Sequence, residues 1–394
     1  MSRSPALASL AARTEALRVQ GLARSLVSVG ETCGRWVEVK GQRCLLMASN
    51  DYLGLAGHPR LAQAAVRAAA TCGTGSGASR LISGTLESHL ELERAIAAFK
   101  HAEAALFFPT GYMTNLGVIS ALAGADDLIV SDQFNHASLI DACRLSRAAV
   151  RVYPHGDAAR AAELLAQEPG GGLKLLVSDG VFSMDGDLAP LPELLQAARE
   201  HGALLVIDDA HATGVYGRTG RGTLEHWGLE PPPEAVMVGT FSKALGGLGG
   251  YVAGAREVIQ ALVNRCRPFI YSTAPPPAQA AVALAGLELV DAEPWRRDKL
   301  KGLCALLRQR LAEAGLRALG QEGPIVPVLV GEADKAVALG EALRRRGVFA
   351  PAVRPPTVPP GTSRIRLTVT AAHEEQDMEA AVLALAQAAR EVGL

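Results

Sequence analysis

Three polar clusters in the sequence each follow a short apolar run, and each contains residues that could do chemistry. The first contains Ser183, the second contains Asp208 and His211, and the third ends at Lys243 beside a glycine-rich segment. A lysine in such a setting can form a Schiff base, because burial or a nearby cation lowers its pKa readily. Taken alone, a lysine after a strand is more often a solvated charge.

Asp208 and His211 come directly after the apolar run at residues 203–207. A carboxylate buried there without a partner would be costly, so Asp208 needs a positive group or hydrogen-bond donors. A pyridinium nitrogen would satisfy the carboxylate and would strengthen a cofactor as an electron sink. The alternative is that Asp208 caps the next helix, and the residues alone leave both interpretations open.

Two further segments could contact a ligand. Gly111 and Tyr112 could open a helix whose amide groups bind a phosphate, although the same pattern is that of an ordinary helix N-terminus. His136 could stack on a flat ring, but a lone histidine is usually structural. The glycines at residues 73–77 do not predict NAD binding, because a helical pattern precedes them where the dinucleotide fingerprint requires a strand.

A sheet must position these clusters. Helical stretches, such as residues 59–70 and 89–100, alternate with short apolar runs, which predicts an α/β fold with a largely parallel sheet and helices on both faces. Ligands bind beyond the carboxyl ends of such strands, so the three clusters should converge at one edge. The predicted strands lie at residues 105–108, 127–130, 173–177, 203–207 and 235–238.

The length of 394 residues predicts two domains, because single cores rarely grow past roughly 250 to 300 residues. We expect an N-terminal arm over residues 1–49, a large domain over 50–285 and a C-terminal α+β domain over 286–394. The arm should hold a helix at residues 7–23 and a short edge strand at 36–39. One long helical stretch should run from the prolines at 275–277 to about Gly315, and Arg364 and Arg366 should share one face of a later strand.

The composition favours small-molecule chemistry. The chain has 39 basic and 40 acidic side chains, so no field of one sign indicates a nucleic-acid partner or a membrane surface. The six cysteines, including Cys33, are scattered singly, and we expect reduced thiols and no metal site. Residues 1–24 contain no apolar run long enough for a signal peptide or a membrane span, and we expect a cytoplasmic location.

Four motifs together resemble the α-oxoamine synthases, a family of fold-type-I pyridoxal 5'-phosphate enzymes. They are residues 135–138 (Asn-His-Ala-Ser), 179–186 (Asp-Gly-Val-Phe-Ser-Met-Asp-Gly), 208–211 (Asp-Asp-Ala-His) and 239–243 (Gly-Thr-Phe-Ser-Lys). The resemblance runs from Arg35 to His373. It implies a fold-type-I transferase with a mostly parallel seven-stranded sheet and a smaller α+β C-terminal domain, with pyridoxal 5'-phosphate as the cofactor.

The resemblance also implies a role for each catalytic and cofactor-binding residue. Lys243 would carry the cofactor as a Schiff base and serve as the catalytic base, and Asp208 would hold the pyridine nitrogen protonated. His136 would stack on the ring, with His211 and Ser183 near the phenolic oxygen. The phosphate would be bound by the following residues, the last two from a neighbouring subunit: Gly111, Tyr112, Thr240, Ser272 and Thr273.

The resemblance therefore implies a homodimer with shared active sites. It places Asn50, Arg354, Thr357 and Arg366 on the substrate side, where an arginine could bind the amino acid carboxylate bidentately. Arg24 matches an arginine at the far end of the substrate. The resemblance does not decide whether Arg354 or Arg366 binds the carboxylate.

Residues 354–359 (Arg-Pro-Pro-Thr-Val-Pro) are most similar to the family members that join L-alanine to pimeloyl-CoA, or to its acyl carrier protein equivalent, in biotin biosynthesis. Other members have glycine C-acetyltransferase, 5-aminolevulinate synthase or serine palmitoyltransferase activity. The loop at residues 79–85 is common to several of them and leaves the acyl donor open. A noncatalytic regulator that binds pyridoxal phosphate is the alternative of another class, but the chain shows no helix-turn-helix extension or basic excess.

Overall fold

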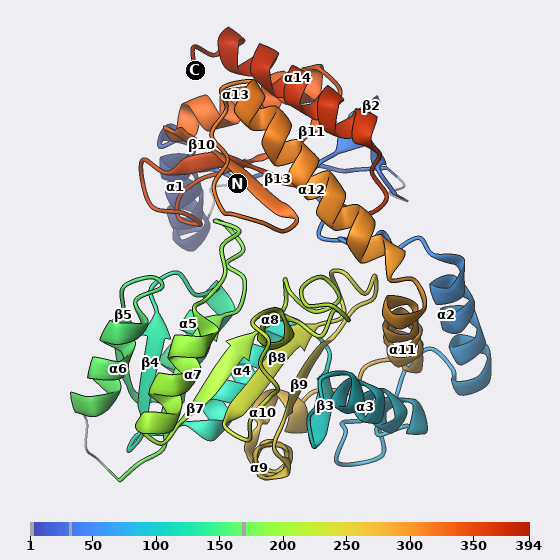
Figure 1. Ribbon diagram of the computed structural model, residues 1–394, viewed down its shortest axis with the longest axis vertical. Coiled ribbons are helices and arrows are strands. Elements are labelled where there is room, and N and C mark those ends of the chain that lie inside the picture. The colour runs from blue at the N-terminus through green and yellow to red at the C-terminus, as the bar shows by residue number, and fades with distance from the viewer. Residues whose placement is uncertain (1–3, 31–33, 168–170) are drawn as a thin grey trace.

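The computed structural model describes residues 4–30, 34–167 and 171–394, which form a lower body around a large sheet and an upper body at the C-terminal end of the chain (Figure 1). In these ranges the large sheet has seven strands, in the spatial order β3-β9-β8-β7-β6-β4-β5. They are β3 (Ala104–Phe108), β4 (Leu128–Asp132), β5 (Ala149–Tyr153), β6 (Lys174–Asp179), β7 (Ala203–Asp208), β8 (Ala235–Thr240) and β9 (Gly250–Gly254).

The sheet is mostly parallel, as predicted. Strands β4 to β8 run parallel to one another, and β9 pairs antiparallel with both β8 and β3. The apolar runs anticipated five of these strands but neither β5 nor β9. Strand β5 lies at the edge of the sheet and is largely exposed, whereas β9 begins and ends with glycine, so neither shows the apolar run of a central strand.

Helices cover both faces of the sheet, and neighbouring residues of β6 and β7 enter different cores. Leu176 and Leu205 belong to one buried cluster, while Leu175 and Val206 belong to the other. Burial on both faces explains why these strands are continuous apolar runs without alternation. The helices of this body are α2 (Pro59–Cys72), α3 (Glu87–Phe99), α4 (Gly111–Leu122), α5 (Ala137–Ser146), α6 (Ala158–Gln167), α7 (Leu191–Glu200), α8 (Thr223–His226), α9 (Arg256–Arg265), α10 (Arg267–Ile270) and α11 (Pro277–Ala292).

The upper body combines the C-terminal part of the chain with strands from its N-terminal part. One small sheet joins β1 (Trp36–Val39), β2 (Gln42–Leu46) and β11 (Val348–Phe349), and the other joins β10 (Ile325–Gly331), β13 (Ser363–Thr368) and β12 (Ala352–Val353). The helices are α12 (Trp295–Glu313), α13 (Ala333–Arg345) and α14 (Glu375–Glu391). The smaller α+β C-terminal part is thus confirmed, while the boundaries proposed for the three domains remain a prediction.

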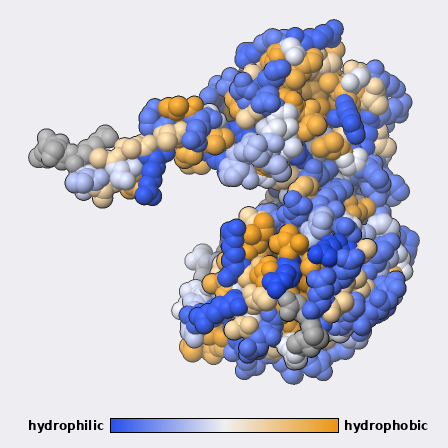
Figure 2. All heavy atoms as spheres, turned by 90° about the vertical axis from the view of Figure 1, so that its left-hand side faces the viewer, coloured by the Kyte–Doolittle hydropathy of each residue, from blue (hydrophilic) through white to orange (hydrophobic). Residues whose placement is uncertain are grey.

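Two helix predictions were wrong in extent. The N-terminal helix α1 (Pro5–Val19) begins earlier than residue 7, with Pro5 in its first turn, and it ends before residue 23 because Gly21 takes a left-handed conformation with φ 66°. The single helix expected up to Gly315 is two helices, α11 and α12, separated at Pro294, since proline breaks a helix interior but suits the start of a new one. No residue of α1 is buried, and Figure 2 shows an arm projecting from the upper body.

A buried ion pair fixes the segment that follows β7. The ammonium of Lys100, at the end of α3, donates to Asp209 Oδ2 at 2.7 Å, and the side chains are 2% and 1% exposed. Lys100 also donates to the carbonyl of Arg221, while Asp209 Oδ1 accepts from the backbone and hydroxyl of Thr223. The pair thereby ties α3 and the start of α8 to the residue next to Asp208.

We expect Lys100→Met to lower the free energy of unfolding by about 3–5 kcal/mol, because it leaves the carboxylate of Asp209 buried without its cation. Denaturant unfolding of the purified variant measures this change. Arg60→Ala is the matched control, since the Arg60–Glu288 pair is about half exposed and should contribute less than about 1 kcal/mol. Equal losses of unfolding free energy in the two variants would mean that the buried Lys100–Asp209 pair stabilises the protein no more than an exposed pair does.

Candidate active site

A cavity of about 250 Å³ opens at the carboxyl ends of β6, β7 and β8, beside the N-terminus of α4. All three polar clusters reach it, so their predicted convergence at one edge of the sheet is confirmed. The predicted residues that line the cavity are Gly111, Tyr112, His136, Ser183, Asp208, His211, Thr240 and Lys243.

Lys243 follows β8 and extends into this cavity. Burial lowers the pKa of its amine to about 8, although the negative charges of Asp208 and Asp179 oppose the shift. Its Nζ lies 3.0 Å from His211 Nε2. The turn after the lysine requires glycine, because Gly246 has a φ of 68° and a Cβ there would lie 2.6 Å from the backbone of Ala56. Near neutral pH, Lys243 is therefore a neutral, nucleophilic amine in a useful fraction of the protein molecules.

Asp208 is the last residue of β7, and its carboxylate is oriented by two hydrogen bonds. Oδ2 accepts from Asn115 Nδ2 at 2.6 Å, and Oδ1 accepts from the backbone of Ala210 at 2.8 Å. The next helix, α8, begins only at Thr223, so the alternative that Asp208 caps the following helix is wrong. The carboxylate faces the cavity instead, where a positive ligand group would stabilise it.

Asp179 lies directly beside Asp208 in the register of β6 and β7. Burial raises the pKa of Asp179, and the adjacent charge of Asp208 raises it further. Its Oδ2 accepts from the backbone N–H of His136 at 2.6 Å, so it positions the residue expected to stack on a ring. His136 in turn caps the N-terminus of α5, where its Nδ1 accepts from the backbone of Ser138.

The N-terminus of α4 and two hydroxyl groups form the other end of the cavity. Thr110 caps the helix by accepting from the backbone of Met113, which confirms that this segment opens a helix. The first N–H groups of a helix are free to bind an anion. Gly111 lets the backbone approach β8, since a Cβ there would lie 3.3 Å from Thr240, whose hydroxyl is 2.7 Å from that of Ser242. This end is suited to a phosphate.

Asn50 and Arg366 lie behind His211 and do not line the cavity. Both contact the hydroxyl of Tyr52, which lies 2.7 Å from His211 Nδ1. Arg366 also donates through Nε to the carbonyl of Ser183, which fixes the loop after β6. These residues connect the upper body to the cavity.

The other predicted residues lie away from the cavity. Arg24 donates to Thr357 Oγ1 at 3.1 Å, and Arg354 donates to the carbonyls of Gly21 and Ala23, so these residues join the N-terminal arm to the segment before β13. Ser272 and Thr273 do not line the cavity, and Thr273 forms an isolated bridge with Ser79. A role for any of these residues in the active site therefore requires a second subunit or a bound substrate.

Sequence reasoning assigned no role to Asp179, Asn115 or Tyr52. Asp179 could have been found, because it ends a strand at the same level as Asp208. Asn115 lies four residues after Gly111, so the two share one face of α4. Tyr52 gave no such signal, because its contact with His211 joins residues 159 positions apart.

The cavity lining fits pyridoxal 5'-phosphate group by group. Lys243 suits the aldehyde, Asp208 suits the pyridine nitrogen, and the N-terminus of α4 with Thr240 and Ser242 suits the phosphate. In the described ranges no group of three or more His, Cys, Asp or Glu side chains could hold a metal ion. The groups that line the cavity thus match the aldehyde, the ring nitrogen and the phosphate of the cofactor.

Two other expectations, reduced cysteines and no membrane span, concern the chain as a whole. The described cysteines Cys44, Cys72, Cys143, Cys266 and Cys304 are free thiols, while Cys33 lies outside the described residues. Among the helices that the structure describes, none has the length and apolar character needed to cross a bilayer.

His155 links the two loops that carry His136 and Ser183. Its Nδ1 lies 3.0 Å from Asp132 and its Nε2 lies 2.7 Å from Asp187, while its ring stacks on Phe134 and meets the edge of Phe182. Burial alone would lower the pKa of His155, but the two carboxylates raise it to about 10. The imidazolium thus holds together segments that follow β4 and β6.

The folded pKa of His155 lies above the value of about 6.5 in an unfolded chain, so its contribution to stability should be complete below about pH 6.5 and lost as the pH rises through about 10. We expect His155→Gln to cost about 3 kcal/mol near pH 6 and much less above about pH 10. Denaturant unfolding of both proteins across this range measures the difference. A difference that stays constant with pH would mean that His155 is not charged in the folded protein.

Comparisons with known proteins agree with this geometry. Residues 42–385 match the family model described as aminotransferase class I and II. The chain is 50% identical over 388 residues to 8-amino-7-oxononanoate synthase of Geobacter sulfurreducens, covering 98% of this chain and 99% of that protein. It is 47% identical to the Geobacter metallireducens protein of the same name, with the same coverage. Among solved structures, the chain is similar to a serine palmitoyltransferase from S. paucimobilis with a bound PLP–myriocin aldimine. The two structures have a TM-score of 0.93 at 30% sequence identity, and the match covers 99% of this chain and 100% of the other.

Proposed function

The chain belongs to the aminotransferase class I and II family and within it to the α-oxoamine synthases, and on this premise we propose that it condenses L-alanine with a pimeloyl thioester. The products are 8-amino-7-oxononanoate, carbon dioxide and the free thiol carrier, a step of biotin biosynthesis. The observation that carries the proposal is the convergence of Lys243, Asp208 and His211 in one buried cavity. The full-length relatives with this activity supply the choice of substrates.

The fold-type-I cavity binds pyridoxal 5'-phosphate. When bound, the cofactor supplies an aldehyde for the substrate amine and a pyridinium ring that draws electrons from the α-carbon. Asp208 is positioned to keep the ring nitrogen positive, because Asn115 and Ala210 hold its carboxylate toward the cavity. His136 would lie against the ring, and Ser183 and His211 would lie at the phenolic oxygen.

Lys243 has two tasks that need different protonation states. As the neutral amine it would bind the cofactor aldehyde and would later take the α-proton of alanine at Nζ. As the ammonium it can return a proton to the same carbon after carbon dioxide has left. A pKa of about 8, lowered by burial, makes both forms accessible near neutral pH.

We assign the carboxylate of alanine to Arg366. Arg366 lies beside Asn50 and Tyr52, next to His211, and its guanidinium can bind a carboxylate bidentately. Arg354 instead donates to backbone carbonyls of the N-terminal arm. We therefore place Arg354, Arg24 and Thr357 toward the acyl end of the substrate.

The protein is proposed to act as a homodimer in which Ser272 and Thr273 complete the phosphate site of the partner. Apolar side chains near these residues are exposed, with Tyr271 71% and Ile82 81% accessible. Such exposed apolar groups support contact with a second copy. A cytoplasmic location and the use of either coenzyme A or an acyl carrier protein belong to the same proposal.

Lys243→Ala should abolish turnover, because no amine then remains in the cavity to hold the aldehyde or to take the α-proton. Borohydride reduction of the wild type with the cofactor, followed by peptide mapping, should label the peptide that contains Lys243. The variant should bind the cofactor without a covalent bond. Label on another lysine in the wild type would contradict the assignment.

The substrate assignment predicts that alanine with a pimeloyl thioester gives the highest kcat/KM. Carbon dioxide release should be measured for alanine, glycine and serine against pimeloyl-, acetyl-, succinyl- and palmitoyl-CoA. One methyl group discriminates by only roughly 1 to 3 kcal/mol, so some activity with glycine is expected. If glycine with acetyl-CoA or serine with palmitoyl-CoA were best, the substrate choice would be wrong while the cofactor chemistry would stand.

A further inference from the structure

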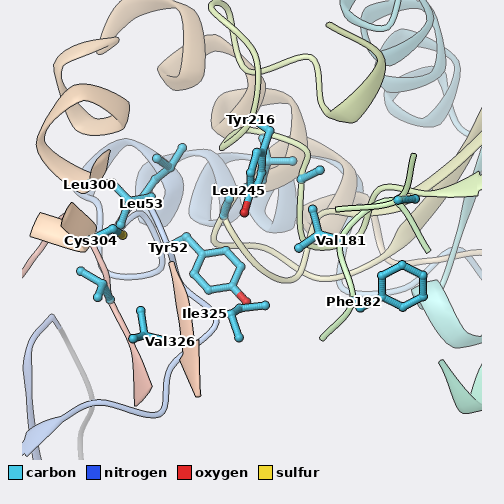
Figure 3. Packing of buried hydrophobic residues seen from close by; sticks show 14 of the residues in the cluster. Tyr52, Leu53, Val181, Phe182, Tyr216, Leu245, Leu300, Cys304, Ile325 and Val326 are labelled. Atoms are coloured by element: carbon cyan, nitrogen blue, oxygen red, sulfur yellow. The ribbon is translucent and has the colours of Figure 1, made fainter. Parts of the chain in front are cut away.

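Tyr52 is a buried residue of the site to which the proposed mechanism gives no role. Its ring packs in a hydrophobic cluster with Leu53, Leu245 and Ile325 (Figure 3). Its hydroxyl has three polar neighbours, which are His211 Nδ1 at 2.7 Å, Asn50 Oδ1 at 3.1 Å and Arg366 Nη2 at 3.5 Å. His211 then reaches Lys243, since Nε2 and Nζ are 3.0 Å apart. A chain of hydrogen bonds therefore runs from Arg366 to the reactive amine.

The direction of this chain is set by Arg366, which can only donate hydrogen bonds. Both of its terminal nitrogens donate to Asn50 Oδ1 at 3.4 Å, and the hydroxyl of Tyr52 donates its single proton to the same oxygen at 3.1 Å. The oxygen of Tyr52 then faces Arg366 and His211 with lone pairs only. His211 must consequently donate from Nδ1–H.

His211 is a neutral imidazole in this setting. Burial lowers its pKa well below the usual value, and the positive charges of Lys243, Arg366 and His136 lower it further. A neutral imidazole has one donor and one acceptor, so a protonated Nδ1 leaves Nε2 with a free lone pair. That lone pair points to the amine of Lys243.

We propose that Tyr52 is a positioning residue, which fixes His211 as the Nδ1–H tautomer and thereby gives the Lys243 ammonium a hydrogen-bond acceptor. This deepens the proposed function and rests on it, because it concerns how strong a base Lys243 is for the α-proton. An acceptor stabilises the ammonium relative to the amine, so it strengthens the base. The carboxylates of Asp208 and Asp179 act in the same direction, and Arg366 acts against it.

Removing the hydroxyl reverses this arrangement. In Tyr52→Phe the Nδ1–H of His211 has no acceptor, and a buried donor without an acceptor is unfavourable. His211 should then take the Nε2–H tautomer and offer Lys243 no lone pair. The amine of Lys243 should become a weaker base that loses its proton at lower pH.

The first measurement is made on the cofactor-free protein and needs no substrate. Nitrogen-15 chemical shifts of the His211 ring, assigned by the signals missing in His211→Asn, should show a protonated Nδ1 and a bare Nε2 in the wild type. The tautomer should change in Tyr52→Phe. It should stay as in the wild type in Tyr216→Phe, a matched control with a buried tyrosine whose hydroxyl donates to the carbonyl of Glu322 at 3.5 Å. A wild-type protein with Nε2–H would overturn the proposal whether or not the variant folds.

The second measurement is the pH dependence of turnover. In Tyr52→Phe the acid limb of the kcat profile should move to lower pH, and the plateau should fall roughly tenfold with KM for alanine little changed. A hydroxyl that only supported Asn50 and Arg366 would instead raise KM and leave the acid limb in place, which would contradict the proposal. If no substrate pair turned over in the wild type, the proposed function would fail while the tautomer measurement would still decide on Tyr52.

Discussion

Two carboxylates lie side by side in a buried cavity, and the rest of the site depends on how their charge is stabilised. Asp179 and Asp208 end neighbouring parallel strands in register, so the sheet itself holds them close. Burying a charge is costly unless partners compensate it. Backbone and amide donors supply part of the compensation, Lys243 supplies a cation, and the cavity leaves Asp208 a place for a positive ring nitrogen.

The surrounding structure holds these groups with buried or half-buried ion pairs that connect elements far apart in the chain. Lys100 fixes the residue after Asp208, and His155 joins the loops that carry His136 and Ser183. Arg364 pairs with Asp185 at 2.5 Å, and Arg366 binds the carbonyl of Ser183. The strand β13 of the upper body therefore contributes directly to the geometry at the edge of the large sheet (Figure 1).

Sequence reasoning predicted the elements with strong local patterns and missed those without them. Continuous apolar runs identified the central strands, because both faces of the sheet are buried, and polar residues at their ends identified Asp208 and Lys243. The edge strand β5 and the glycine-bounded β9 lack such a run. The contact of Tyr52 with His211 and the link of Arg366 to Asn50 join distant parts of the chain, so no spacing in the sequence could reveal them.

In the proposed mechanism Asp208 keeps the pyridine nitrogen of the cofactor protonated. Nitrogen-15 spectroscopy of the protein loaded with pyridoxal phosphate labelled at that nitrogen measures its protonation directly. We expect a protonated nitrogen in the wild type and a neutral one in Asp208→Asn, since an amide cannot stabilise the positive charge as a carboxylate does. A protonated nitrogen in Asp208→Asn, or a neutral one in the wild type, would contradict it.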